Sequence, residues 1–371
     1  MRAVAPANVI HHARRVALPR RRATRPRALG DALTTYLARE SARGNIDPEL
    51  AVTLNAIAFA CKRVRALVAR APLSGNTGSL GVSNASGDEQ KRLDVLANDV
   101  FVDALRSSGR TGTIVTEEEA TPIACARVEN GYVATFDPID GSSNIDACVA
   151  TGSIFGVYAP GACEVDAEDG GEETLRKCVT NALRSGESLV AAGYCMYSSS
   201  AVFVLTTGDG VYQFDYDENV GDFVMSKERM MIPDGSKMQR IYSGNNGNVD
   251  LWAPELRDYI SHLQNGGSDK GKPWTYRYIG ALVADFHRTL NYGGLWLYPP
   301  DSKAPEGKAR LLYEIAPCSM IVEQAGGMSM RGKMADERVL EVVPTGIHQK
   351  SPMFIGSASA VKDLQEFLKK Y

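Results

Sequence analysis

The apolar residues of this chain recur every three to four residues in some segments and every second residue in others, the spacings typical of helices and strands. A helix is predicted over 47–70, because Asp47-Pro48-Glu49 offers a cap, a first residue with fixed φ and an acid in the first turn. Another is predicted over 89–107, closed by Gly109. Further helices are expected over 254–264, 281–292, 314–325 and 361–368.

Short runs rich in β-branched and aromatic residues predict strands between these helices. The expected strands cover 112–116, 132–137, 154–158, 189–197, 201–206, 211–216, 241–243 and 295–298. Because strands and helices are mixed along the whole chain, we expect a layered α/β or α+β fold. A change in sequence texture predicts an N-terminal domain over 31–222 and a C-terminal domain over 223–371.

Charge is spread unevenly along the chain. Residues 1–30 contain eight arginines and no acidic residue, although the 371 residues together carry a net charge of −3. An acid-free, arginine-rich leader is typical of an organelle transit peptide; a disordered basic tail is the alternative. The overall composition does not favour a nucleic-acid partner. No apolar run approaches the ~20 residues of a membrane helix, so we expect no membrane partner either.

The segment Phe136–Asn144 carries the most informative chemistry. An apolar strand leads into Asp137 and Asp140, and Gly141-Ser142-Ser143 follows directly. Two buried carboxylates repel each other and require a cation, and oxygen ligands suit Mg²⁺ or Mn²⁺. The amides and hydroxyls of residues 141–143 would suit phosphate oxygens. The alternative is a solvated turn built from ordinary turn-forming residues.

Two further acidic positions follow apolar runs. Glu117, Glu118 and Glu119 come directly after the predicted strand 112–116, and Glu314 follows Leu311–Tyr313 at an expected strand-to-helix junction. Acids at the ends of apolar strands lie where α/β folds place their ligand sites. Three such positions in one chain favour a single shared metal centre.

Several longer motifs resemble those of the fructose-1,6-bisphosphatase family, from about residue 31 to the C-terminus. They are FDPIDGSSNID (136–146), KRLDVLANDV (91–100), AGYCMYSSS (192–200), YIGALVADFHRTLNYGG (278–294), GKARLLYE (307–314) and PTGIHQKSP (344–352). The resemblance implies the layered sandwich of the sugar phosphatase superfamily, in which helix layers alternate with mixed sheets. It also implies hydrolysis of the 1-phosphate of fructose 1,6-bisphosphate with two or three Mg²⁺ per subunit.

The resemblance assigns roles to individual residues. The implied metal ligands are Glu117, Glu118, Asp137, the Ile139 carbonyl, Asp140 and Glu314. Asp94 and Glu118 would orient and deprotonate the attacking water, with Asp88 nearby. The implied substrate contacts are Gly141, Ser142, Ser143, Asn245, Arg277, Tyr278, Tyr298, Lys308 and Arg310. The family's arginine that matches Arg277 reaches across to a neighbouring subunit, so the resemblance implies a homo-oligomer, expected to be a tetramer.

An acidic insertion over 161–186 contains Cys163 and Cys178. Plastid members of the family carry such an insertion, and the resemblance implies a Cys163–Cys178 disulfide that thioredoxin reduces to activate the enzyme. Exposed thiols in a flexible loop would suit this chemistry; the alternative is a solvated loop with incidental cysteines. With the leader, the insertion predicts an enzyme of the chloroplast stroma, acting in the Calvin cycle and starch synthesis. Sedoheptulose-1,7-bisphosphatase and a catalytically inactive sugar-phosphate sensor are the alternative functions.

Overall fold

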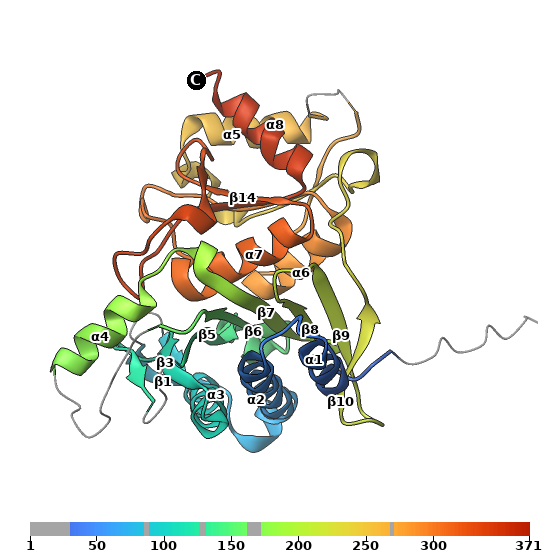
Figure 1. Ribbon diagram of the computed structural model, residues 1–371. Coiled ribbons are helices and arrows are strands. Elements are labelled where there is room, and N and C mark those ends of the chain that lie inside the picture. Colours follow the sequence, from blue (N-terminus) through green and yellow to red (C-terminus); the bar gives the residue numbers. More distant parts are fainter. Residues whose placement is uncertain (1–29, 85–88, 126–130, 162–171, 268–270) are drawn as a thin grey trace, which may run out of the picture.

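Layers of helices and sheets alternate through the molecule (Figure 1). The computed structural model describes residues 30–84, 89–125, 131–161, 172–267 and 271–371. Its α-helices are α1 (Leu33–Ala42), α2 (Pro48–Ser74), α3 (Arg92–Ser108), α4 (Glu172–Ala182), α5 (Pro254–Gln264), α6 (Leu282–Tyr292), α7 (Ala316–Gln324) and α8 (Ala358–Leu368). Helices α1–α3 cover one face of a large sheet, and α6 and α7 lie between this sheet and a smaller one.

The large sheet has eight strands in the order β10-β9-β8-β7-β6-β5-β3-β4. They are β3 (Thr111–Thr116), β4 (Ile123–Ala124), β5 (Tyr132–Asp140), β6 (Thr151–Tyr158), β7 (Leu189–Tyr197), β8 (Ala201–Thr206), β9 (Val211–Asp217) and β10 (Asp222–Lys227). Only the β3–β5 pair among these is parallel. A two-stranded hairpin, β1 (Ser79–Ser83) with β2 (Glu89–Lys91), lies apart from the sheet and leads into α3.

Strand β5 is buried along its whole length because helices cover both faces of the sheet. Phe136 points towards the first helix layer and stacks on Phe101 of α3, with ring centroids 4.8 Å apart. Val133 belongs to the core on the opposite face, which the sheet shares with α6 and α7. Strand β5 therefore ends in the layer between two hydrophobic cores.

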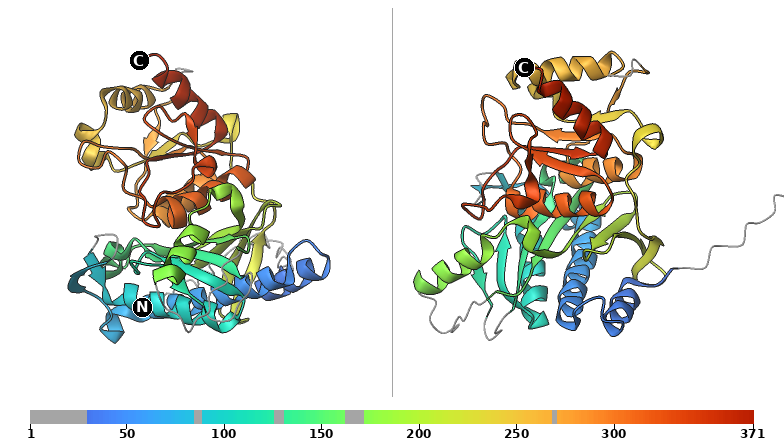
Figure 2. Two further views of the ribbon diagram at one scale, coloured as in Figure 1. Left: turned by 60° about the vertical axis from the view of Figure 1, so that its left-hand side comes forward. Right: turned by 45° about the horizontal axis from the view of Figure 1, so that its top comes forward.

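The smaller sheet has six strands in the order β12-β11-β13-β16-β14-β15. They are β11 (Ile241–Ser243), β12 (Thr275–Tyr276), β13 (Leu295–Tyr298), β14 (Met328–Arg331), β15 (Glu337–Arg338) and β16 (Met353–Gly356). Helices α5 and α8 cover its outer face, and the same layer order is visible from two other directions (Figure 2). The predicted layered α/β sandwich is thus confirmed.

Most predicted elements occur at or near their expected positions, and three differ. The helix predicted over 89–107 begins at Arg92, because residues 89–91 pair with β1. The expected strand-to-helix junction before Glu314 is a π-helix, Leu311–Ile315, that runs into α7. The insertion 161–186, expected to be a loop, contains α4. The division after residue 222 stays a prediction, and β10, which begins there, pairs with β9.

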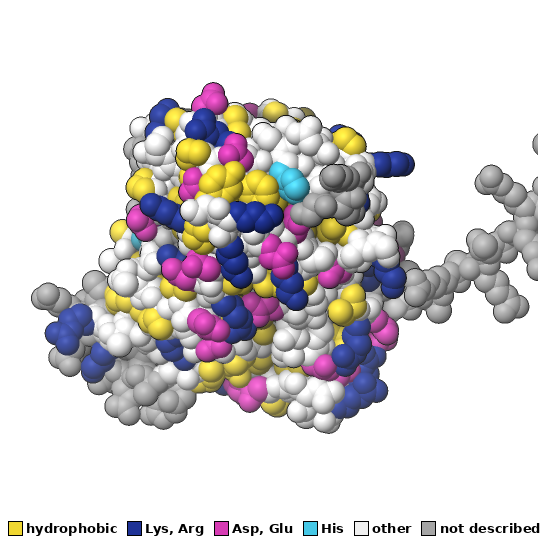
Figure 3. Space-filling model, turned by 90° about the horizontal axis from the view of Figure 1, so that it is seen from above, with side chains coloured by type: hydrophobic (Ala, Val, Ile, Leu, Met, Phe, Trp, Pro, Cys, Tyr) yellow, Lys and Arg dark blue, Asp and Glu magenta, His cyan; other side chains and the backbone are white. Residues whose placement is uncertain are grey.

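None of the helices in the described residues is long and apolar enough to span a membrane. On the face seen from above, acidic and basic side chains alternate over the surface (Figure 3). Residues 1–29 of the predicted leader lie outside the described residues, as do Asp88 and Cys163.

Candidate metal and phosphate site

The end of β5 does not continue as a regular strand. Its pairing with β6 shifts register between Asp137 and Asp140, so both acids lie within the strand rather than after it. The Asp137 carboxylate accepts a hydrogen bond of 2.9 Å from the Ile139 amide, which holds the irregularity in place. An irregularity of this kind re-aims the side chains that follow it. Asp137 and Asp140 therefore face different partners.

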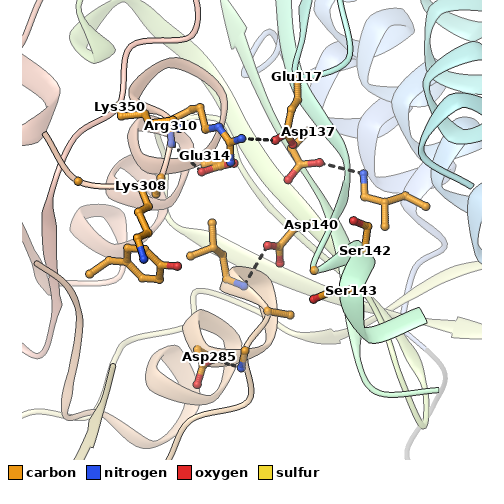
Figure 4. A pocket seen from close by; sticks show the side chains of 18 of the residues that line it. Glu117, Asp137, Asp140, Ser142, Ser143, Asp285, Lys308, Arg310, Glu314 and Lys350 are labelled. Atoms are coloured by element: carbon orange, nitrogen blue, oxygen red, sulfur yellow. Dashed lines mark hydrogen bonds and ion pairs between the residues drawn. The ribbon is translucent and has the colours of Figure 1, made fainter. Parts of the chain in front are cut away.

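Asp137 meets two other buried carboxylates. Oxygens of Glu117, Asp137 and Glu314 lie within 4.8 Å of one another, although they come from the turn after β3, from β5 and from the π-helix (Figure 4). π-Helical turns occur frequently at functional sites, because they displace one side chain from the regular helical pattern. The structure thus brings together the three acidic segments that the sequence predicted to share one centre.

Arg310 lies against this cluster. Its guanidinium is 2.8 Å from Glu117 and 3.4 Å from Glu314, and its backbone amide donates to Glu314 at 2.7 Å. The arginine side chain is only 11% exposed. Three acids and one guanidinium leave the cluster with an excess of negative charge when all are ionised.

The carboxylates respond to this crowding. Burial, followed by the charge of Glu314, raises the pKa of Glu117 to about 8. Burial and the charge of Glu117 hold the pKa of Asp137 well above its ordinary value. Closely spaced oxygen donors that resist ionisation without a cation fit Mg²⁺ or Mn²⁺. The residues present therefore fit the divalent metal that the family resemblance implies.

Asp94 lies at the start of α3, near the metal cluster. Its Oδ2 accepts a hydrogen bond of 2.8 Å from the Lys91 amide, whereas its buried Oδ1 has no partner among the described residues. Burial raises the pKa of Asp94 to about 7, and the charges of Glu118 and Glu117 add to this. A carboxylate with such a pKa and one unsatisfied oxygen is suited to accept a proton.

Glu118 is held by the β1–β2 hairpin. Gln90 donates to one carboxylate oxygen at 2.5 Å and Asn84 to the other at 3.3 Å. Burial nevertheless raises the pKa of Glu118. Asp94 in α3 and Glu118 after β3, the two side chains predicted to orient and deprotonate the attacking water, thus come from elements that pack against each other.

The Asp140 carboxylate faces α6 instead of the three-acid cluster. It accepts hydrogen bonds from the amides of Leu282 at 3.0 Å and Val283 at 2.7 Å. Burial raises the pKa of Asp140 to about 7 although these bonds favour the ionised form. Gly141 follows with φ of +75°, and a Cβ there would lie 2.7 Å from the Cβ of Ala281. A glycine is therefore required where β5 meets the start of α6.

These groups line one cavity of about 730 Å³. Of the predicted site residues, it contains Asp94, Glu117, Glu118, Asp137, Ile139, Asp140, Gly141, Ser142, Ser143, Tyr278, Tyr298, Lys308, Arg310 and Glu314. Asn245 lines a small neighbouring pocket that shares Tyr298 and Lys308 with the large one. Arg277 is exposed and lines neither of them. Cys178 is buried on α4, contrary to the expectation of an exposed thiol.

Sequence reasoning did not assign a role to several residues of the cavity, among them Lys91, Lys303, Asp285 and Lys350. The Asp285 carboxylate is almost fully buried and accepts hydrogen bonds from Ser243 at 2.7 Å and from the Gly280 amide at 3.0 Å. It holds the loop that carries Tyr278. Asp285 and Lys350 lie inside motifs that the sequence does reveal, so their position in a motif was the available signal.

Comparison with known proteins decides the family. The model of the fructose-1-6-bisphosphatase N-terminal domain matches residues 32–228, and that of the C-terminal domain matches residues 236–369. The chain belongs to the fructose-1,6-bisphosphatase family. The resemblance drawn from the motifs is therefore confirmed, and the protein is an enzyme, a phosphatase.

Relatives in this family match over most of the chain. A protein named "Fructose-1,6-bisphosphatase 1, chloroplastic" from Arabidopsis thaliana is 50% identical over 343 residues, 91% of this chain and 80% of the relative. The "Fructose-1,6-bisphosphatase, chloroplastic" of Triticum aestivum is 48% identical over 338 residues, 91% of this chain and 81% of the relative. The holo form of Leishmania major fructose-1,6-bisphosphatase superposes with a TM-score of 0.83 at 36% identity, covering 92% and 99% of the two chains.

Proposed function

We propose that this enzyme hydrolyses the 1-phosphate of fructose 1,6-bisphosphate to fructose 6-phosphate and phosphate, and that it depends on Mg²⁺. The observation that carries the proposal is the cluster of Glu117, Asp137 and Glu314, three buried carboxylates in a cavity that lysine and arginine side chains also line. A sugar bisphosphate carries about four negative charges, which lysine and arginine donors would neutralise. Lys308, Arg310 and Lys350 supply such donors on the side opposite β5 (Figure 4).

The carboxylates of Glu117, Glu118, Asp137, Asp140 and Glu314, with the Ile139 carbonyl, would hold two or three Mg²⁺; Mn²⁺ is the second candidate. When bound, the metal supplies charge stabilisation and a more acidic water. Glu118, fixed by Gln90 and Asn84, orients the water. Asp94 takes the proton at Oδ1, the oxygen without a partner among the described residues. Asp88, which lies outside those residues, is proposed to assist.

The remaining groups would bind and orient the sugar. The amides of Gly141 and Ser142 and the hydroxyl of Ser143 are proposed to bind the 1-phosphate at the end of β5. Asn245, Tyr278 and Tyr298, around the two adjoining pockets, would bind the 6-phosphate end. The exposed Arg277 would complete this end in a neighbouring subunit, which is why we propose a homotetramer.

A plastid location is proposed from two observations. The relatives from Arabidopsis and wheat are named chloroplastic, and this chain begins with an arginine-rich, acid-free segment. We place the enzyme in the chloroplast stroma, acting in the Calvin cycle and starch synthesis. Import of a fusion of residues 1–30 to a fluorescent protein into isolated chloroplasts tests this; a fusion that stays outside contradicts it.

Redox control by thioredoxin through Cys163 and Cys178 is proposed from the family resemblance. Helix α4, which carries Cys178, packs against β3 and β4, and Glu117 directly follows the last residue of β3, Thr116. This packing supports a connection between the insertion and the metal cluster. The test is the activity of the Cys163→Ser variant with and without reduced thioredoxin. We expect the variant to have the same activity in both conditions. Activation of the variant by reduced thioredoxin to the same extent as the wild type would contradict the proposal.

Phosphate release from fructose 1,6-bisphosphate and from sedoheptulose 1,7-bisphosphate distinguishes the proposed substrate from the alternative. We expect kcat/KM to be higher for the six-carbon substrate, with Mg²⁺ present. A higher kcat/KM for sedoheptulose 1,7-bisphosphate would identify that compound as the preferred substrate and contradict the proposal.

A further inference from the structure

Residues 345–351 form a segment whose position is fixed by backbone pairing, although the proposed reaction uses none of its side chains except Lys350. The Leu311 amide donates to the Gln349 carbonyl at 2.8 Å, and the Ser351 amide donates to the Ala309 carbonyl at 2.9 Å. A Cβ on Gly307 would lie 2.5 Å from the Ser351 backbone, so the two chains approach too closely for a side chain there. His348 therefore projects from a rigid support.

Both ring nitrogens of His348 have hydrogen-bond partners. Nε2 lies 3.0 Å from the backbone carbonyl oxygen of Glu119, and Nδ1 lies 2.9 Å from the Tyr313 hydroxyl. A carbonyl oxygen only accepts, so Nε2 carries the hydrogen. In the neutral ring Nδ1 then accepts from the Tyr313 hydroxyl. Burial lowers the pKa of His348, and the nearby Arg310 lowers it further, in agreement with a neutral ring.

The two partners of His348 belong to separate metal-site segments. Glu119 ends the acidic turn that begins with Glu117, and Tyr313 precedes Glu314 in the π-helix. Asn98 of α3 donates to the Glu119 side chain at 3.3 Å, so the turn is held from the other side as well. The imidazole thus spans the two segments whose carboxylates meet in the cluster.

We propose that His348 is a positioning residue that sets the separation of Glu117 and Glu314 and thereby tunes the affinity of the site for divalent metal. This inference rests on the proposed metal dependence. The hydrogen bond from His348 Nε2–H to the Glu119 carbonyl is responsible for this positioning, because it is the bond of the ring that reaches the acidic turn.

Two amide substitutions separate the two bonds of the ring. The amide nitrogen of glutamine reaches the position of Nε2, and the amide group of asparagine reaches that of Nδ1. In the full-length protein without substrate, we expect His348→Asn to weaken Mn²⁺ binding about fivefold by isothermal titration calorimetry. The Mn²⁺ affinity of His348→Gln should stay within about twofold of that of the wild type. The Mg²⁺ concentration that half-saturates phosphate release should likewise rise more in His348→Asn than in His348→Gln. His262→Asn on α5, away from the cluster, is the matched control.

Two results would overturn the inference. Equal Mn²⁺ affinity in wild type, His348→Asn and His348→Gln would mean that the ring does not tune the site. Equal weakening in both variants, with a lower melting temperature of the metal-free protein, would mean that the ring only stabilises the fold. Absence of Mn²⁺ binding by the wild type would instead contradict the proposed metal dependence itself.

Discussion

The Asp140 carboxylate accepts a hydrogen bond of 2.7 Å from the backbone amide of Val283, 143 residues further along the chain. Asp140 ends β5 in the large sheet, and Val283 lies in the first turn of α6, between the two sheets. An acid from the sheet therefore caps a helix of the next layer. This contact fixes the position of residues 141–143, the proposed phosphate-binding residues, relative to α6.

Replacing Asp140 should therefore lower stability as well as activity. Asp140→Ala leaves the partly buried Leu282 amide and the buried Val283 amide without their acceptor, which should cost roughly 2 kcal/mol of unfolding free energy in the metal-free protein. Urea denaturation at about pH 6 measures this, and Ser143→Ala is the control on the same segment. Unchanged stability in Asp140→Ala would contradict the capping role.

Arg310 should compensate for buried negative charge when metal is absent. Arg310→Met should destabilise the metal-free protein by roughly 3 kcal/mol at about pH 8, because buried carboxylates lose their counter-charge. Added Mg²⁺ should restore most of the loss, and the loss should shrink at about pH 6. Lys308→Met is the control, since Lys308 is 45% exposed and lies 3.8 Å from Asp301. A loss insensitive to both pH and Mg²⁺ would rule out this compensation.

Stabilisation by Mg²⁺ should grow with pH. Because the folded-state pKa values of Glu117 and Asp94 are raised to about 8 and about 7, the folded protein holds protons there that the unfolded chain has released. The metal-free protein consequently loses stability as pH rises from about 4 to about 8. Metal replaces those protons, so the rise in melting temperature with Mg²⁺ should be larger at about pH 8 than at about pH 6. A larger rise at the lower pH would contradict the proposed site.

His287 should produce the opposite pH dependence. Burial lowers its pKa from 6.5 to about 4, and its ring lies between the Tyr194 hydroxyl at 2.7 Å and the Asn291 amide at 3.2 Å. The contribution of the neutral His287 ring to the free energy of unfolding is fully present above pH 6.5 and is lost as pH falls towards about 4. Its full size is roughly 3 kcal/mol. Comparing acid unfolding of wild type and His287→Gln measures it. Parallel curves for the two proteins would contradict the assignment.

Local pattern predicts the fold well where one residue period dominates. Strands β7, β8, β11 and β13 and helix α5 begin and end where their apolar pattern predicts. The run Leu311–Tyr313 is an exception, because its apolar pattern predicts a strand and does not reveal the π-helix. Its Leu312 carbonyl accepts hydrogen bonds from Thr135 and Tyr158, both in the large sheet. Contacts across more than 150 residues leave no local signal.

The candidate site divides in the same way. Acids at strand ends indicated a metal centre, and the motifs named the residues around it. The hydrogen bonds of Asp140 to α6, the burial of Asp285 and the bridge formed by His348 depend on layers that meet only in the folded protein.

The most direct test of the metal-dependent phosphatase proposed here is a Mg²⁺ titration of phosphate release from fructose 1,6-bisphosphate, with wild type and Glu314→Gln. Glu314 is the cluster acid furthest along the chain from β5. We predict no release with chelator, saturable activation of the wild type by Mg²⁺, and activity lower by about 10²-fold or more in Glu314→Gln. Hydrolysis that persists with chelator, or a fully active Glu314→Gln enzyme, would contradict the account.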